Sequence, residues 1–211
     1  MTTEETVPNT TSRQKKVGNA LRRETRDRLL QAAEAEFAVH GYAGTTVTRL
    51  AAAAGVSVQT LYLAWGSKRQ LLRGYMERVL AGPADSPEDA AGRFDDMSPP
   101  ERLEELANLV AEIADRAALG WSLYRDAAAV DAEIADDWNE LQLLRHRLIS
   151  RIIAEIPATA LNDGLTGKAA ADTAWTIVSP DSYDLLVRRL GYPLDDFRDW
   201  MKRTLNAAIL R

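Results

Sequence analysis

The feature that most constrains this chain is a helical pattern broken at a single glycine within residues 45–68, TTVTRLAAAAGVSVQTLYLAWGSK. Before Gly55, apolar residues recur at three- and four-residue spacing, which places them on one face of a short helix that Thr46 can cap. After Gly55, Ser57 can accept hydrogen bonds from the first amides of a second short helix. Two short helices joined by a glycine turn are typical of a helix-turn-helix.

The second of these helices has a composition suited to base edges. Val56 and Leu61 supply its inward face. Hydroxyls, an amide and a methyl-bearing group remain for the outward face: Ser57, Val58, Gln59, Thr60 and Tyr62. Glutamine can bond adenine in the major groove, a Val or Thr methyl can meet the thymine methyl, and hydroxyls serve bases or phosphates. An ordinary helical hairpin with a polar face would share this pattern, so the spacing alone leaves both interpretations open.

A further helix is expected from Ser67 to about Leu80. Ser67 with Gln70 forms a capping box at its start, and Lys68 lies in its first turn. A lysine there is unfavourable for the helix dipole. It therefore needs another partner, and a DNA phosphate is one.

A larger set of residues carries the same signal. These are Leu29, Ala32, Ala33, Phe37, Gly41, Tyr42, Thr45, Thr46, Val47, Leu50, Ala51, Ala54, Gly55, Val56, Ser57, Thr60, Leu61, Tyr62, Ser67, Lys68 and Leu71. Over this whole segment the sequence resembles the DNA-binding domain of the tetracycline-repressor (TetR) family of transcriptional regulators. The resemblance implies that Thr46, Tyr62 and Lys68 contact phosphates, and that residues 57–62 form the recognition helix.

The sequence departs from the family pattern directly after that helix. Leu63 and Ala64 stand where the family often has a His and an aromatic residue, and Trp65 replaces the usual Phe. Ala64 puts one commonly used DNA contact in question.

Charge is distributed unevenly along the 211 residues. Residues 1–80 carry 12 Lys and Arg against 7 Asp and Glu, or +5, whereas residues 81–211 carry 14 against 24, or −10. A basic first part favours nucleic acid as its partner. There is no apolar run of eighteen residues, no signal-peptide pattern and no cysteine, so we expect a cytoplasmic protein without membrane contact.

Residues 1–20 are polar and are expected to be a disordered tail. Its basic end, with Arg13, Lys15, Lys16, Arg22 and Arg23, is either simply solvated or an arm that touches phosphates or the minor groove. A first helix should follow over residues 21–40, with Gly41 ending it, so that residues 21–80 form the DNA-binding domain.

Residues 81–211 are expected to form an effector-binding and dimerisation domain made of helices. Breakers and capping residues predict a loop over 82–97, with at most a short helix beginning near Ser86, then helices over 98–113, 120–130, 132–156, 166–177, 179–190 and 194–209. The buried stripe of the longest helix is expected to contain Ile134, Trp138, Leu141, Leu148, Ile152 and Ile156. No stretch alternates as a strand should, so the chain is predicted to be all-α with nine or ten helices.

Four aromatic residues on separate predicted helices could meet inside a bundle: Trp121, Tyr124, Trp138 and Trp175. The family resemblance implies an effector pocket enclosed by these helices, and bundle interiors commonly hold apolar ligands. Plain core packing would explain the same residues. Composition indicates an effector that is apolar or aromatic and not strongly anionic.

The last helices are expected to form a homodimer. Ala170 and Ala174 offer a small face for close approach, and the apolar stripe of the last helix should leave a surface for a second copy: Phe197, Met201, Leu205 and Ala208.

Enzyme chemistry has little support. Only His40 and His146 are available as imidazoles, neither at catalytic or metal-ligand spacing, and no hydrolase, metalloprotease or dinucleotide motif occurs. We therefore expect no metal and no cofactor. The sequence favours a ligand-responsive, dimeric regulator, most simply a repressor, that binds a near-palindromic operator. The alternatives are an architectural DNA-binding protein without an effector, and a helical-bundle enzyme with a DNA-binding adaptor.

Overall fold

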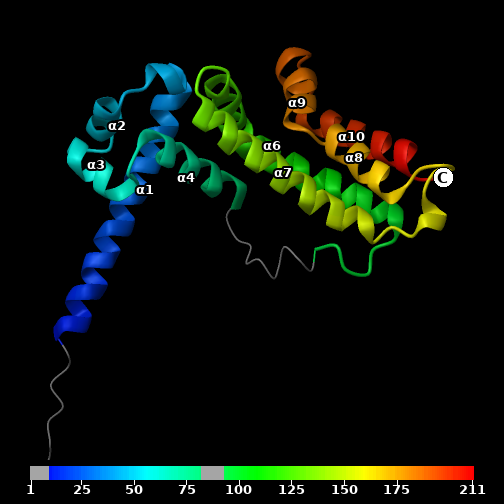
Figure 1. The fold of residues 1–211 in the computed structure, drawn as a ribbon, viewed down its shortest axis with the longest axis horizontal. Coiled ribbons are helices and arrows are strands. Elements are labelled where there is room, and N and C mark those ends of the chain that lie inside the picture. The colour runs from blue at the N-terminus through cyan, green and yellow to red at the C-terminus, as the bar shows by residue number, and fades with distance from the viewer. Residues whose placement is uncertain (1–9, 82–92) are drawn as a thin grey trace, which may run out of the picture. The chain divides into compact units, whose positions relative to one another are not determined.

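The computed structural model describes residues 10–81 and 93–211, with the backbone alone for residues 10–17 (Figure 1). The chain forms two compact units, an N-terminal unit that ends at Tyr75 and a C-terminal unit that begins at Met76. The junction lies inside α4 (Lys68–Ala81), before the boundary expected at residue 80. Within the described ranges the regular secondary structure is helical, with a single bridge between Leu161 and Leu210 besides, in agreement with the predicted all-α class.

The N-terminal unit contains α1 (Thr10–Gly44), α2 (Val47–Ala53), α3 (Val58–Trp65) and the start of α4. Its core is formed by apolar side chains from all four helices: Leu29, Ala33, Phe37, Leu50, Ala51, Leu61, Leu71 and Leu72. Their spacing of three and four residues is the pattern that predicted these helices, and burying that shared face fixes α2 and α3 against α1.

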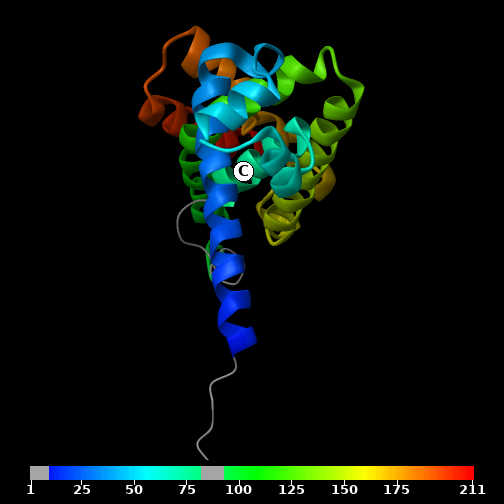
Figure 2. The ribbon, with the colours of Figure 1, turned by 90° about the vertical axis from the view of Figure 1, so that its left-hand side faces the viewer.

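Helix α1 is longer than predicted at its start. It begins at Thr10, so the expected disordered tail is wrong for residues 10–20, while residues 1–9 lie outside the described part. The physical reason is that no proline interrupts this stretch, and its one glycine, Gly18, costs a helix only about 1 kcal/mol. The N-terminal half of α1 extends past α2 and α3 (Figures 1 and 2). Near its other end the backbone leaves helical geometry at Gly41, where φ is 64°.

The C-terminal unit is built on a long hairpin of α6 (Pro99–Ala128) and α7 (Ala132–Ala154). A short 3-10 turn η1 (Ala158–Ala160) leads to α8 (Gly167–Ile177), which packs on α7. Then α9 (Pro180–Tyr183) continues into the π-helical turn η2 (Asp184–Arg189), and α10 (Leu194–Ile209) packs on α6 and α8 (Figure 1).

Capping residues set several of these boundaries. The capping box predicted at Ser98 is present, with the Ser98 amide donating to the Glu101 carboxylate at 2.9 Å. Thr166 caps α8 by accepting from the Ala169 amide at 3.2 Å, also as predicted. Asp131 caps α7 by accepting from the amide of Ile134 at 3.3 Å. The expected short helix near Ser86 lies outside the described residues.

Helix α6 corrects one predicted boundary. The helices expected over 98–113 and 120–130 are a single helix, because Gly120 is buried inside it instead of ending a loop. Ala114 and Ala117 are buried on the same face. Ala114, Ala117 and Gly120 recur at three-residue spacing and form a packing surface on α6. In the sequence alone, Gly120 resembles the end of a helix.

The buried stripe of α7 also differs from the prediction. Ile149 and Ile153 are buried, whereas Leu148 retains 49% of its exposure. Ile134 and Ile156 are buried as predicted. Between residues 148 and 153 the buried positions lie one residue later than predicted, which leaves Leu148 on a face that borders a cavity described below.

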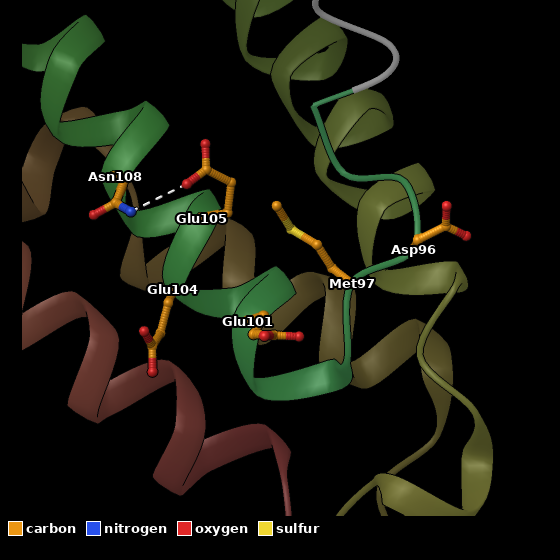
Figure 3. A pocket seen from close by; sticks show the side chains of 6 residues that line it. All are labelled: Asp96, Met97, Glu101, Glu104, Glu105 and Asn108. Carbon is orange, nitrogen blue, oxygen red and sulfur yellow. Dashed lines mark hydrogen bonds between the residues drawn. The ribbon is translucent and has the colours of Figure 1, made fainter.

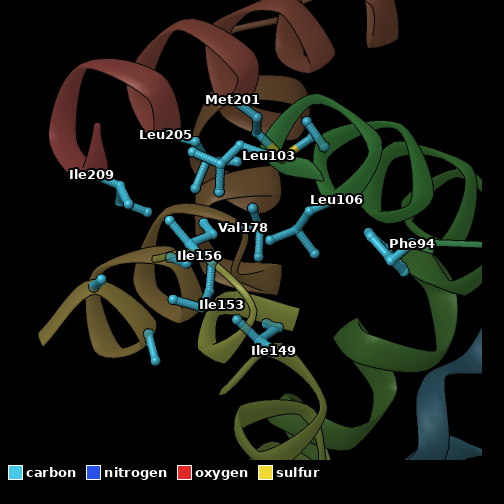
Figure 4. Close-up of a cluster of buried hydrophobic side chains, with 14 of the residues drawn as sticks. Phe94, Leu103, Leu106, Ile149, Ile153, Ile156, Val178, Met201, Leu205 and Ile209 are labelled. Carbon is cyan, nitrogen blue, oxygen red and sulfur yellow. The ribbon is translucent and has the colours of Figure 1, made fainter. Parts of the chain in front are cut away.

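The core of the C-terminal unit corrects the predicted dimer interface (Figure 4). Ala170, Ala174, Phe197, Met201 and Leu205 are completely buried within this one chain, packed among side chains of α6, α7 and α8. They cannot line an interface between two intact copies. The apolar stripe of α10 is covered by its own bundle, and only Ala208 of the predicted set is half-exposed.

Candidate DNA-binding surface and ligand cavity

The turn between α2 and α3 depends on one left-handed residue. Gly55 has φ of 65°, a conformation that side chains disfavour, and the following amide of Val56 donates to the carbonyl of Ala51 at 2.9 Å. Ser57 then starts α3 by accepting from the Thr60 amide at 3.0 Å. The predicted helix-turn-helix is present, with α3 as its second helix.

The residues predicted to contact DNA lie on and beside α3. Ser57, Gln59 and Tyr62 are exposed, whereas Val58 and Thr60 are half-exposed. The Ser57 and Thr60 hydroxyls bond to each other at 2.8 Å, so these two groups are held by the cap. Gln59 and Tyr62 thus remain the more accessible polar groups of this predicted set on α3.

Two predicted phosphate contacts sit at helix starts. Thr46 caps α2, accepting from the Arg49 amide at 3.2 Å, and remains exposed. The Lys68 ammonium donates to the carbonyls of Tyr42 and Thr45 at 2.8 and 2.9 Å and lies 4.0 Å from the centre of the Tyr42 ring. Lys68 therefore finds its partners within the chain, in the carbonyl groups of Tyr42 at the end of α1 and of Thr45 directly after it.

Leu63 was not among the predicted contacts, yet it is the most exposed large hydrophobic side chain of α3. It retains 81% of its exposure and lies one helical turn after Gln59, on the same face. The sequence signal for Leu63 as a candidate DNA contact is its apolar side chain on the outward face of the second helix, because that face has no core to pack against.

Trp65 is held by groups from two other helices. The Arg26 guanidinium stacks 3.7 Å from the ring centre and donates to the Ala64 carbonyl at 2.5 Å. On α4, the hydrogen-only side chain of Gly74 leaves room for the ring, since a Cβ there would lie 2.1 Å from it. The departure from the family pattern at Trp65 is accommodated by this glycine.

In the C-terminal unit, one hollow near the start of α6 is acidic (Figure 3). It is lined by Asp96, Met97, Glu101, Glu104, Glu105 and Asn108. Glu105 accepts from the Asn108 amide at 3.1 Å and also pairs with Arg93, and Glu101 belongs to the Ser98 capping box. Glu101 and Glu105 therefore have structural roles, and residues 10–81 and 93–211 contain no acidic or histidine cluster arranged to hold a metal ion.

A second hollow is apolar and has a volume of about 400 Å³, within the usual range for small-molecule sites. It lies between α6 and α7 and is closed at one side by the last residues of α4. Its lining consists of Leu80, Ala81, Leu106, Leu109, Val110, Ile113, Trp121, Leu141, Gln142, Leu144, Arg145, Leu148, Ile149, Ile152 and Val178.

Only one of the four aromatic residues predicted for a pocket lines this cavity. Trp121 does, with its ring edge-on to Tyr183 at 6.1 Å. Tyr124 and Trp138 instead stack on each other at 6.1 Å, and Trp175 lies beneath the guanidinium of Arg145. Aliphatic side chains make most of the cavity wall, among them Leu141, Leu148 and Ile152 of the predicted buried stripe.

Arg145 is the one charged residue in this lining. It donates from Nε to the Gln142 side chain at 3.1 Å, and from Nη1 to the Trp175 and Val178 carbonyls at 3.0 and 3.1 Å. Burial lowers the pKa of Arg145 to about 10, so the guanidinium stays charged at neutral pH.

Fold and site together define a helix-turn-helix protein with a separate helical domain that encloses a cavity. Residues 29–75 match the family described as bacterial regulatory proteins, tetR family. The HTH-type transcriptional repressor SCO4008 of Streptomyces coelicolor is 37% identical over 76 residues, an alignment that covers 34% of this chain and 39% of that repressor. The chain therefore matches well under half the length of this relative.

Solved structures extend the likeness of fold to both units. NalD, the secondary repressor of the MexAB-OprM multidrug efflux pump in Pseudomonas aeruginosa, superposes with a TM-score of 0.70 at 18% identity, covering 90% of this chain and 98% of NalD. A TetR transcription regulator from Haloarcula marismortui gives 0.66 at 18% identity, covering 88% of this chain and 98% of that one. Residues 29–75 thus match the helix-turn-helix domain of the tetR family, and the chain is similar in fold to both of these regulators.

Proposed function

We propose that the protein is a DNA-binding transcriptional repressor that acts as a homodimer and is released from a near-palindromic operator by a small, largely apolar effector. The observation that carries this proposal is α3, a short helix that Ser57 caps after the turn at Gly55, with Gln59, Tyr62 and Leu63 exposed to solvent. This arrangement matches a recognition helix in a major groove.

Each group on the N-terminal unit then has a role. Gln59 bonds a base edge, Leu63 meets a thymine methyl, and Ser57, Val58 and Thr60 line the groove close to the cap. Tyr62 and Thr46 contact phosphates. Lys68 adds positive charge near the backbone while it joins α4 to the end of α1.

The aliphatic cavity is the effector site in this proposal. Leu80 and Ala81 at the end of α4 belong to its wall, and Arg116 of α6 donates to the Val79 carbonyl at 3.0 Å. The same helix begins at Lys68, which is bonded to the end of α1. A ligand that prefers one position of the end of α4 would therefore act on the helix that carries Lys68.

Dimerisation follows from the operator geometry, because two half-sites about one helical turn apart require two recognition helices held at a fixed spacing. The interface is a surface other than the buried stripe of α10. Sedimentation of the full chain is expected to give a dimer at micromolar concentration, and a monomer at that concentration would contradict the proposal.

The decisive experiment is selection of binding sites from random duplexes with the full chain, followed by release with small molecules. An operator of two inverted half-sites is expected. A bound effector should lower the affinity of the protein for this operator about 5- to 150-fold, and bound operator should lower the affinity for the effector by the same factor. An architectural protein would bind DNA but show no release. Recovery of no preferred sequence would reject the proposal.

A further inference from the structure

The cavity in the C-terminal unit combines an apolar wall with a single positive charge. Of the residues that line it, Arg145 alone is charged, and Gln142, already bonded to Arg145, is the one polar neighbour. The remaining lining is aliphatic apart from the Trp121 ring. A ligand that fills this space must be mostly apolar, and its only strong polar contact would be with the guanidinium.

The contacts of Arg145 leave its charge without a directly bound anion. Its hydrogen bonds run to the Gln142 amide oxygen and to the carbonyls of Trp175 and Val178, all of them neutral acceptors. Asp181 is the carboxylate whose charge acts on it most, but that side chain is largely exposed and pairs with Arg125 at 3.5 Å. A mostly buried cation without a paired anion is costly, so a carboxylate that reached it would be favoured.

The geometry also leaves donors available. A guanidinium has five N–H groups, and Nε and Nη1 make all the bonds that Arg145 forms to the described part of the chain. Nη2 has no acceptor there. The planar group lies over the Trp175 ring at 5.1 Å, which fixes its orientation at the cavity wall.

We propose that the cavity is selective for amphipathic monocarboxylates, molecules with an aliphatic body and one carboxylate that accepts hydrogen bonds from Arg145. The inference rests on the proposed function in one respect, because it names the chemical class of the effector. The aliphatic wall takes the body of the molecule, and the single guanidinium selects one negative charge. Dianions and cations are excluded, since no second positive group and no carboxylate line the cavity.

The test compares head groups on one chain length, using the whole 211-residue chain. Decanoate, decanol and decyltrimethylammonium are titrated at pH 7 by calorimetry. Charge-assisted bonds to a guanidinium are among the strong ones, so decanoate should bind about tenfold or more tightly than decanol, and the ammonium most weakly. Arg145→Gln should bring decanoate to the affinity of decanol and leave decanol unchanged, whereas Arg147→Gln, on the exposed face of α7, should change neither.

Because Arg145 also bonds carbonyls at the end of α8, its substitution could unfold the domain. Two measurements on the unsubstituted protein settle the matter in that case: the ratio of decanoate to decanol affinity, and its loss as the pH falls through the pKa of the ligand carboxyl. Equal affinities for the two probes, no binding of decanoate at millimolar concentration, or an unchanged ratio in a folded Arg145→Gln protein would overturn the proposal. Operator selection is scored separately, so a chain that prefers decanoate but selects no DNA contradicts the proposed function alone.

Discussion

Both units contain helix caps and long-range polar bonds, but different kinds of contact lie at their two candidate sites. In the N-terminal unit, short-range polar groups start helices: Thr46 and Ser57 each bond an amide three residues on, and the outward face of α3 stays open to solvent. In the C-terminal unit, charged groups join elements far apart in the sequence. Arg145 of α7 bonds carbonyls at the end of α8, and Asp184 of η2 bonds Arg125 of α6.

This difference separates what each unit can do. A surface built from local caps presents a rigid set of side chains to a partner that approaches from outside. A helical bundle whose elements are joined by buried charged groups can enclose a cavity. Its packing can change when a bound ligand forms new contacts with those charged groups. The following predictions test this contrast, beginning with the largest expected effect.

Leu205→Arg is expected to unfold the C-terminal unit. Leu205 is completely buried, and an unpaired guanidinium in its place should cost at least about 4 kcal/mol of the free energy of unfolding. Chemical denaturation followed by circular dichroism measures this loss. A folded, monomeric Leu205→Arg protein would instead show that this residue belongs to an interface between copies. Arg203→Leu, on the exposed face of the same helix, is the control and should leave the unit folded.

Gly74→Ala is expected to destabilise the N-terminal unit by about 1–3 kcal/mol, although alanine favours helix formation, because its Cβ would overlap the Trp65 ring. Thermal unfolding of the full chain measures the effect. Combining Gly74→Ala with Trp65→Phe should recover part of the loss, since the smaller ring leaves room for the methyl group. Absence of any such recovery would show that Trp65 and Gly74 are not coupled.

Asp184→Asn is expected to lower stability by about 2 kcal/mol at pH 7, because Arg188 and Arg189 would lose their charged partner and Arg125 would keep only the exposed Asp181. Arg125, Arg188 and Arg189 each lie 3.1 Å from this carboxylate. Burial alone would raise the pKa of Asp184, but Arg125 first, and then the other two arginines, lower it below its ordinary value.

The sign of the pH dependence follows from that shift. A carboxylate with a lowered pKa in the folded state contributes stability that is fully present above its unfolded pKa of about 3.9, and that is lost as the pH falls through the folded pKa. The difference in unfolding free energy between Asp184→Asn and the unsubstituted chain should therefore shrink below about pH 4. A difference that stays constant down to pH 2 would contradict the assigned role.

Local patterns made much of the fold predictable. Gly55, Ser57, Ser98 and Thr166 act within three or four residues, so the turn and caps can be read from neighbouring letters. The continuity of α6 could not be read this way, because Gly120 is a breaker in isolation and a packing residue once another element lies against it.

The same limit applies to the sites. The residues on the outward face of α3 follow from the spacing within one helix, so they could be predicted from the sequence. Arg145 stands between Leu144 and His146 in what resembles a polar helix face, and its burial depends on carbonyls about thirty residues further along the chain. Charge and hydropathy of neighbours carry no information about such a contact, so the cavity's one charged group was missed.

The smallest expected effect concerns Leu63. Its side chain is almost fully exposed, so Leu63→Ala should leave the unfolding free energy within about 0.5 kcal/mol of the unsubstituted chain. If Leu63 meets a thymine methyl, its truncation should reduce the preference for that base pair by about 1 kcal/mol, the low end of the range for a base contact. Site selection with the substituted protein measures the change at each position. Gln59→Ala, one turn earlier, should relax a different position and by more, about 1–3 kcal/mol, because it removes hydrogen bonds. A uniform loss of affinity over all sequences in either variant would assign that residue to the phosphate backbone instead of the bases.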